Sequence, residues 1–203
     1  LTKDGTRKLI NGTFDWVYEE EFNCRDGFRW SPDGTMIAFW QVDATKIKDY
    51  YMLNTTDSNY SQVIPVEYPK VGETPSAVKV GVVNINTRNI KWMDIAGDPQ
   101  QHYIPRMEWS GKNELVVQQL NRKQQESKLI YCNVTDGKAR VFWTENNQAW
   151  VDLNTSDPKG WNWINDGKEF IWVSEKDGWR HIYKISRDGT AEIDLTTGTY
   201  DIE

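Results

Sequence analysis

A unit of two strands joined by a tight turn recurs along this chain, and this repeat constrains the fold most strongly. Residues 28–39, 107–117 and 161–172 each contain an aromatic-rich segment, a turn and a second apolar segment. Asp33-Gly34 and Asp166-Gly167 supply two of the turns, because glycine adopts the positive φ that tight hairpin turns require. A second hairpin follows in each unit, over residues 82–92, 129–141 and 181–193.

Four strands that recur about every 50 residues are typical of β-propeller blades, in which each sheet packs its faces on its neighbours. The sequence therefore predicts an all-β fold, a partial β-propeller of about three four-stranded antiparallel blades. We place the blades at about 28–97, 98–148 and 149–197, within a single propeller domain that includes all of residues 1–203. Residues 5–10 are assigned to the last strand of a preceding blade.

The first blade is interrupted between Tyr50 and Pro75. Residues 54–59 are polar and turn-prone, and residues 63–66 are mostly β-forming. An excursion of this length within a compact domain is either functional or an ordinary long surface loop. We call residues 50–75 the arm.

Three consecutive carboxylates, Glu19, Glu20 and Glu21, lie among large aromatic side chains. Adjacent carboxylates repel each other, so such a run is either a solvated acidic face or a site for a cation. Asp15 precedes the run and can cap a single helical turn by accepting a backbone N–H two or three residues later. Side chains on that turn are about 100° apart, so Glu20 and Glu21 can converge on one ammonium group while Glu19 points away.

The same residues resemble a known family. Residues 15–21, with the sequence DWVYEEE, and residues 28–34, with the sequence FRWSPDG, are similar to the N-terminal propeller of the dipeptidyl peptidase IV family of serine peptidases. The resemblance implies that Glu20 and Glu21 hold the free α-amino group of a peptide substrate. Trp16, Tyr18 and Phe22 then support the acidic turn, with Trp16 and Phe22 buried.

The resemblance has further implications for the parent protein. It implies an eight-bladed propeller, of which this chain supplies somewhat under half, and a C-terminal α/β-hydrolase domain outside the chain. The parent is then expected to release dipeptides after proline or alanine, to need no cofactor, to form a homodimer through the arm, and to be periplasmic, extracellular or membrane-associated. Two alternatives remain open: a non-catalytic propeller that serves as a binding module, and a tripeptidyl or oligopeptidase relative.

The rest of the sequence offers few candidates for a catalytic, metal or nucleic-acid site. No Gly-x-Ser-x-Gly elbow occurs, so we expect no catalytic residue in this chain and no activity from it alone. His102 and His181 have no cysteine or carboxylate at metal-ligand spacing, so we expect structural roles, with Arg180 and His181 forming hydrogen bonds between strands, and no bound metal. Cys24 and Cys132 are expected to be free thiols. The net charge of −6 gives a nucleic-acid partner no electrostatic support.

Two further expectations concern residues near the acidic run and the third blade. Arg25 and Arg29 are placed either against the carboxylates or in solvent. The family's Phe-Arg pair, which lines an extended substrate pocket, should fall near residues 150–153, where neither residue type is present.

Overall fold

The computed structural model describes residues 1–153 and 161–203, and these residues form antiparallel strands with a seven-residue helix and a short 3-10 turn. In the described residues, one five-stranded and two four-stranded antiparallel sheets are the blades of a partial β-propeller, so the predicted fold class is confirmed. Contacts divide the chain into two compact units: Leu1–Trp92 with Gly97–Gln101, and Met93–Ala96 with His102–Glu203. Among the described residues, no helix is both long and apolar enough to cross a membrane.

The first unit is built on strand β3 (Met36–Asp43), which pairs along its whole length with β6 (Ala77–Asn84), and β6 pairs with β7 (Ile90–Trp92). Two short strands share the other edge of β3: β1 (Leu9–Asn11) pairs with residues 41–43, and β2 (Phe28–Trp30) pairs with residues 37–39. The prediction that residues 5–10 belong to a preceding blade is therefore wrong. Leu9 and Ile10 extend the first sheet, because the chain leaves the edge of β3 after β1 and returns to the same edge as β2.

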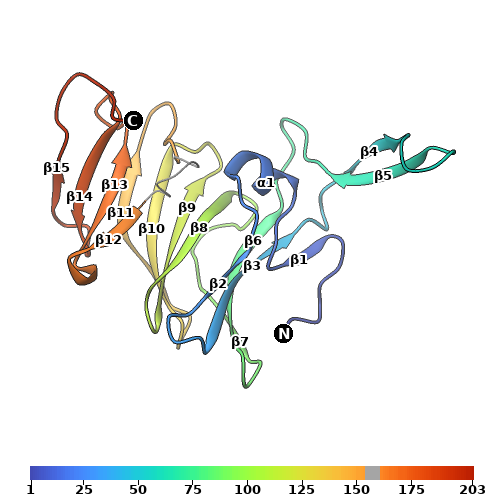
Figure 1. Ribbon diagram of the computed structural model, residues 1–203, viewed down its shortest axis with the longest axis horizontal. Coiled ribbons are helices and arrows are strands. Elements are labelled where there is room, and N and C mark those ends of the chain that lie inside the picture. Colours follow the sequence, from blue (N-terminus) through green and yellow to red (C-terminus); the bar gives the residue numbers. More distant parts are fainter. Residues whose placement is uncertain (154–160) are drawn as a thin grey trace. The chain divides into compact units, whose positions relative to one another are not determined.

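The excursion between β1 and β2 carries helix α1 (Trp16–Phe22), drawn in dark blue in Figure 1. The two ends of this excursion, Gly12 and Gly27, meet beside Trp40 of β3, and we call these three residues the neck. Gly12 N donates to Trp40 O at 3.0 Å, Gly27 N donates to Gly12 O at 3.1 Å, and Trp40 N donates to Gly27 O at 3.0 Å. A Cβ on Gly27 would lie 2.6 Å from Gly12 C and from Thr13 N, so the neck closes only around glycine.

The predicted arm contains a separate hairpin. Strands β4 (Asp49–Asn54) and β5 (Gln62–Glu67) pair with each other, from Asp49 opposite Glu67 to Asn54 opposite Gln62. Figure 1 shows this arm hairpin projecting away from β3 and β6. Its base is held by ion pairs: Arg7 contacts Asp49 at 3.1 Å and also Glu67, and Lys8 contacts Asp49 at 2.9 Å. The residues that lead from β5 back to β6, 68–76, are called the return segment below.

The second unit contains two four-stranded meanders. One has the order β11 (Ala139–Asn146), β10 (Glu126–Asn133), β9 (Glu114–Asn121) and β8 (His102–Gly111). The other has the order β12 (Trp161–Ile164), β13 (Glu169–Ser174), β14 (His181–Ser186) and β15 (Glu192–Asp194), with the 3-10 turn Asn165–Gly167 between β12 and β13. The blade that the sequence places at 149–197 includes residues 154–160, which lie outside the described residues.

Large apolar side chains from both meanders of the second unit form one core. Alternate residues of a strand point to the same face, so Phe170 and Trp172 of β13 both enter this core. Trp143 of β11 meets them, with ring centroids 6.4 Å from Phe170 and 4.9 Å from Trp172. The other members are Val116, Leu129, Tyr131, Phe142, Trp161, Tyr183 and Ile185.

Candidate functional site

Helix α1 begins at the cap that the sequence predicts. The Asp15 side chain accepts a hydrogen bond from Tyr18 N at 3.1 Å, with extended backbone at Asp15. The helix continues beyond the single predicted turn and ends where Asn23 adopts a left-handed conformation, with φ 51°. Glu19 lies in its first turn, whereas Glu20 and Glu21 lie toward its last turn, which carries no basic residue. The helix dipole disfavours negative charge there, so contacts with the rest of the unit must hold α1 in place.

One face of α1 is fixed by an aromatic column. Tyr18 and Phe22 are buried, and their ring centroids are 5.4 Å apart. Phe14 stacks on Tyr18 at 5.6 Å and reaches Trp40 of β3 at 5.2 Å. This column joins the helix to the sheet at Trp40. The backbone of Trp40 also makes the hydrogen bonds to Gly12 and Gly27 in the neck.

The support from Trp16 differs from the expectation. The sequence predicts a buried Trp16, but its side chain is only partly buried. Its ring packs on Tyr68 of the return segment, with centroids 4.3 Å apart. Trp16 therefore contacts the base of the arm, whereas Tyr18 and Phe22 contact the core.

The carboxylates lie on the opposite face. Glu20 and Glu21 are exposed, and within residues 1–153 and 161–203 neither has an ion-pair partner. Glu19 is paired with Arg25, with 3.5 Å between Oε2 and Nη1. Arg29 pairs with Asp26 at 3.2 Å, and its guanidinium lies 5.5 Å from the Trp40 ring centroid. The structure thus separates Glu19 from the two glutamates that the sequence assigns to the site.

The N-terminus of α1 has a second anchor that the sequence does not reveal. Ser76 Oγ donates to Asp15 Oδ2 at 2.6 Å, and both side chains are buried. Burial raises the pKa of Asp15, while the hydrogen bonds from Ser76 and Tyr18 oppose that rise. Ser76 is far from Asp15 in sequence, and no local pattern signals the contact.

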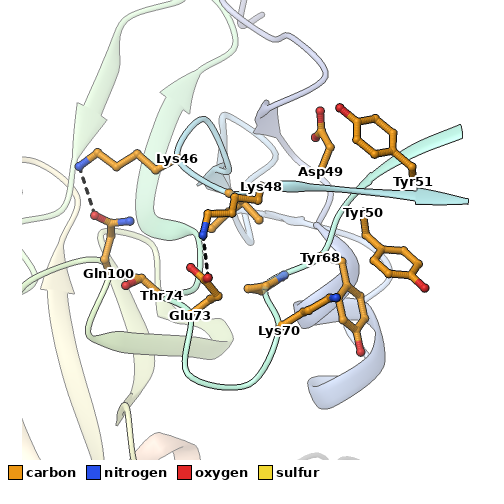
Figure 2. A pocket seen from close by; sticks show the side chains of 12 residues that line it. Lys46, Lys48, Asp49, Tyr50, Tyr51, Tyr68, Lys70, Glu73, Thr74 and Gln100 are labelled. Carbon is orange, nitrogen blue, oxygen red and sulfur yellow. Dashed lines mark hydrogen bonds and ion pairs between the residues drawn. The ribbon is translucent and has the colours of Figure 1, made fainter.

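A cavity of about 710 Å³ lies at the base of the arm (Figure 2). Its lysines are already partnered. Lys46 bonds to Gln100 at 3.2 Å, Lys48 pairs with Glu73 at 2.8 Å, and Lys70 lies 5.4 Å from the Tyr50 ring centroid. The lining comes from several segments of the first unit, so sequence reasoning did not find it: Lys46, Ile47, Lys48, Asp49, Tyr50, Tyr51, Tyr68, Pro69, Lys70, Glu73, Thr74 and Gln100.

His181 lies among carboxylates that sequence reasoning overlooked. Its Nδ1 is 2.8 Å from Asp177 and 3.6 Å from Asp194, and its Nε2 is 3.1 Å from the carbonyl oxygen of Tyr200. The three side chains are close enough to hold a metal ion. The 2.8 Å separation is a hydrogen-bond length, however, and is shorter than the roughly 3.0–3.4 Å between two ligands about 2.1 Å from one ion. The ring therefore ties the turn before β14 to the chain after β15.

Arg180 and His102 each have a hydrogen-bond partner within the second unit. Arg180 donates a hydrogen bond from its backbone N–H to Asp201 at 2.7 Å. Within the described residues, its side-chain Nε is buried and has no hydrogen-bond partner. His102 is buried, with Nδ1 2.9 Å from Gln119 Nε2. Cys24 and Cys132 are not joined in a disulfide, as expected, and burial raises the pKa of each thiol to about 12. Near the expected Phe-Arg position, Trp150 is exposed.

Known proteins resemble this chain over its whole length. The family described as the dipeptidyl peptidase IV (DPP IV) N-terminal region matches residues 1–203. A probable dipeptidyl peptidase 4 of Emericella nidulans is 27% identical over 217 residues, covering 100% of this chain and 28% of the relative. Dipeptidyl peptidase 4 of Trichophyton tonsurans is 29% identical over 215 residues, covering 100% of this chain and 27% of the relative.

Solved structures give the same result. The crystal structure of Porphyromonas gingivalis dipeptidyl peptidase 4 matches with a TM-score of 0.91 and 32% identity, covering 100% of this chain and 28% of that one. A putative dipeptidyl aminopeptidase IV from Bacteroides ovatus matches with a TM-score of 0.82 and 25% identity, covering 97% of this chain and 30% of that one. The chain thus spans 27–30% of the length of these relatives.

Proposed function

The chain belongs to the dipeptidyl peptidase IV family, whose N-terminal region matches all of residues 1–203, and we propose that its helix α1 binds the free α-amino group of a peptide substrate through Glu20 and Glu21. The observation that carries the proposal is the contrast between the two faces of α1. One face is fixed by buried Tyr18 and Phe22, while the other presents two exposed carboxylates without an ion-pair partner in the described residues. Such a pair is complementary to an ammonium group.

An ammonium held by two carboxylates makes charge-assisted hydrogen bonds, which are roughly twice as strong as neutral ones. Anchoring the N-terminus also sets the cleavage position. Two residues span at most about 7 Å in an extended chain, so a fixed ammonium determines which peptide bond reaches a nucleophile at a fixed distance. In this proposal the parent protein is a serine peptidase that releases dipeptides, and the nucleophile belongs to a hydrolase domain outside residues 1–203.

Charge-neutral substitution tests the amine-binding role. In the full-length protein, Glu20→Gln and Glu21→Gln should each lower kcat/KM for a chromogenic Gly-Pro substrate by about thirtyfold to several thousandfold, because losing one partner of a paired charge costs about 2–5 kcal/mol. Glu19→Gln is the matched control, since Glu19 pairs with Arg25; its effect should be mild. An N-acetylated substrate should not be cleaved. If both Gln variants keep near-wild-type kcat/KM, α1 is only a solvated acidic face.

We also propose that the arm hairpin pairs with a second copy of the chain in the parent homodimer. Within the described part of the chain, each strand of this two-stranded sheet has one edge that pairs with no other strand, and an isolated hairpin is marginally stable in water. Its apolar side chains are exposed to 68% for Tyr51, 63% for Leu53 and 61% for Val63. A surface of this kind favours a protein partner. Sedimentation of an arm-deleted full-length protein tests this proposal.

A further inference from the structure

The return segment, residues 68–76, touches α1 at two separate points. The Tyr68 ring packs on Trp16 with centroids 4.3 Å apart, and the Ser76 hydroxyl donates to Asp15 at 2.6 Å. Both contacted residues lie at the N-terminal end of α1, one turn before the exposed glutamates. The return segment, which leads from the arm hairpin back to β6, therefore also contacts the N-terminal end of α1.

Helix α1 depends on such contacts because it is unstable alone. Seven residues are too few for an isolated helix in water. Glu20 and Glu21 lie toward the end that the helix dipole makes unfavourable for negative charge. A small displacement of the Glu20 and Glu21 carboxylates would matter, since a misplacement of about 1 Å can cost about 100-fold in rate.

The return segment is itself held at several places. The Tyr68 ring centroid is 5.6 Å from that of Tyr50 at the base of the arm hairpin, and Lys70 lies over the same Tyr50 ring. Glu73 pairs with Lys48 at 2.8 Å. Figure 2 shows Tyr50, Tyr68 and Lys70 grouped together on the right, with the Lys48–Glu73 pair to their left. The return segment is therefore fixed to the base of the arm hairpin and contacts α1 as well.

We propose that Tyr68 and Ser76 are positioning residues for amine recognition, which hold α1 through Trp16 and Asp15 so that Glu20 and Glu21 meet the substrate ammonium. This inference rests on the proposed function. Neither residue touches the substrate. Each acts only through the orientation of the helix, so its contribution depends on the presence of the glutamates.

Single substitutions in the full-length protein provide the first measurement. Ser76→Ala leaves the buried Asp15 carboxylate without one donor, and Tyr68→Leu removes the ring beside Trp16. Each should lower kcat/KM for the unblocked Gly-Pro substrate by about fivefold to fiftyfold, mainly through KM. Tyr68→Phe keeps the ring and should restore activity to within twofold. Trp179→Leu is the matched control, because Trp179 is an exposed aromatic residue outside the arm, the return segment and α1.

Labelling by a serine-directed fluorophosphonate separates this effect from damage to the hydrolase domain. That reagent has no ammonium, so its rate should be unchanged in the Tyr68 and Ser76 variants. A variant that loses labelling has lost the nucleophilic site, and such a result would overturn the positioning role for that residue.

Double variants give the decisive measurement. In a Glu21→Gln background the amine site is already disabled, so adding Ser76→Ala or Tyr68→Leu should cause less than a twofold further loss. Losses that multiply would show an effect independent of the glutamates and overturn the inference. If Glu21→Gln lowers kcat/KM as expected while Ser76→Ala and Tyr68→Leu keep wild-type kcat/KM, only this inference fails. If Glu20→Gln and Glu21→Gln are themselves active, the proposed function fails with it.

Discussion

Gly27→Ala tests the claim that the neck on β3 holds the acidic helix. The added Cβ would lie 2.6 Å from Gly12 C and Thr13 N and 2.9 Å from Gly12 O. These are backbone atoms, so no side chain can move aside. The neck would have to open by about 0.8 Å to reach the 3.4 Å of ordinary contact. The neck hydrogen bonds, now 3.0–3.1 Å long, would then exceed normal hydrogen-bond length.

The expected cost follows from these contacts. Losing one or two backbone hydrogen bonds costs about 1 kcal/mol each, and overpacking adds about 1–3 kcal/mol, so the free energy of unfolding should fall by about 2–5 kcal/mol. Urea unfolding followed by tryptophan fluorescence measures this change. Because the neck carries α1, kcat/KM for the Gly-Pro substrate should also fall by tenfold or more.

Two further glycines serve as controls for Gly27→Ala. Gly111→Ala places a Cβ in open space and should be neutral. Gly12→Ala meets no atom within 4 Å but sits at φ +74°, so it should cost about 1–2 kcal/mol through backbone conformation alone. If Gly27→Ala matches Gly111→Ala in both stability and activity, the steric account of the neck is wrong.

Two other predictions concern the second unit and the arm. Glu145 is buried and accepts hydrogen bonds from Trp172 and Ser174, and burial raises its pKa. When the pKa of a carboxyl is raised in the folded state, the protein loses stability as the pH rises from 4.5 through that raised pKa. The stability of Glu145→Gln should therefore increase relative to wild type across this pH window. Urea unfolding of both proteins at pH 4.5 and pH 8 measures the difference, and an equal difference at both pH values would contradict the prediction. Replacing residues 51–65 by an Asn-Gly turn keeps the base contacts of Asp49 and Glu67 and should give a folded monomer; a dimer in sedimentation would exclude the arm from the interface.

The sequence alone was sufficient for features that depend on neighbouring residues. The hairpin repeat predicted the antiparallel blades, because alternation and Asp-Gly turns act over a few residues. The Asp15 cap was predicted for the same reason, since its partner Tyr18 is three residues away. The acidic run also marked Glu20 and Glu21 as candidates, although their role stays a proposal.

Tertiary structure decided the features that depend on residues far apart in the chain. The assignment of residues 5–10 to another blade failed because the pairing of β1 with β3 is non-local and becomes visible only when the excursion closes at Gly12 and Gly27. His181 likewise lies close to Asp194 only because β14 pairs with β15. Ser76 and Tyr68 reach α1 because the chain folds back after the arm hairpin, and no periodicity in the sequence encodes a contact of that range. Local patterns report backbone conformation, whereas the partners of a buried polar or aromatic side chain are set by packing.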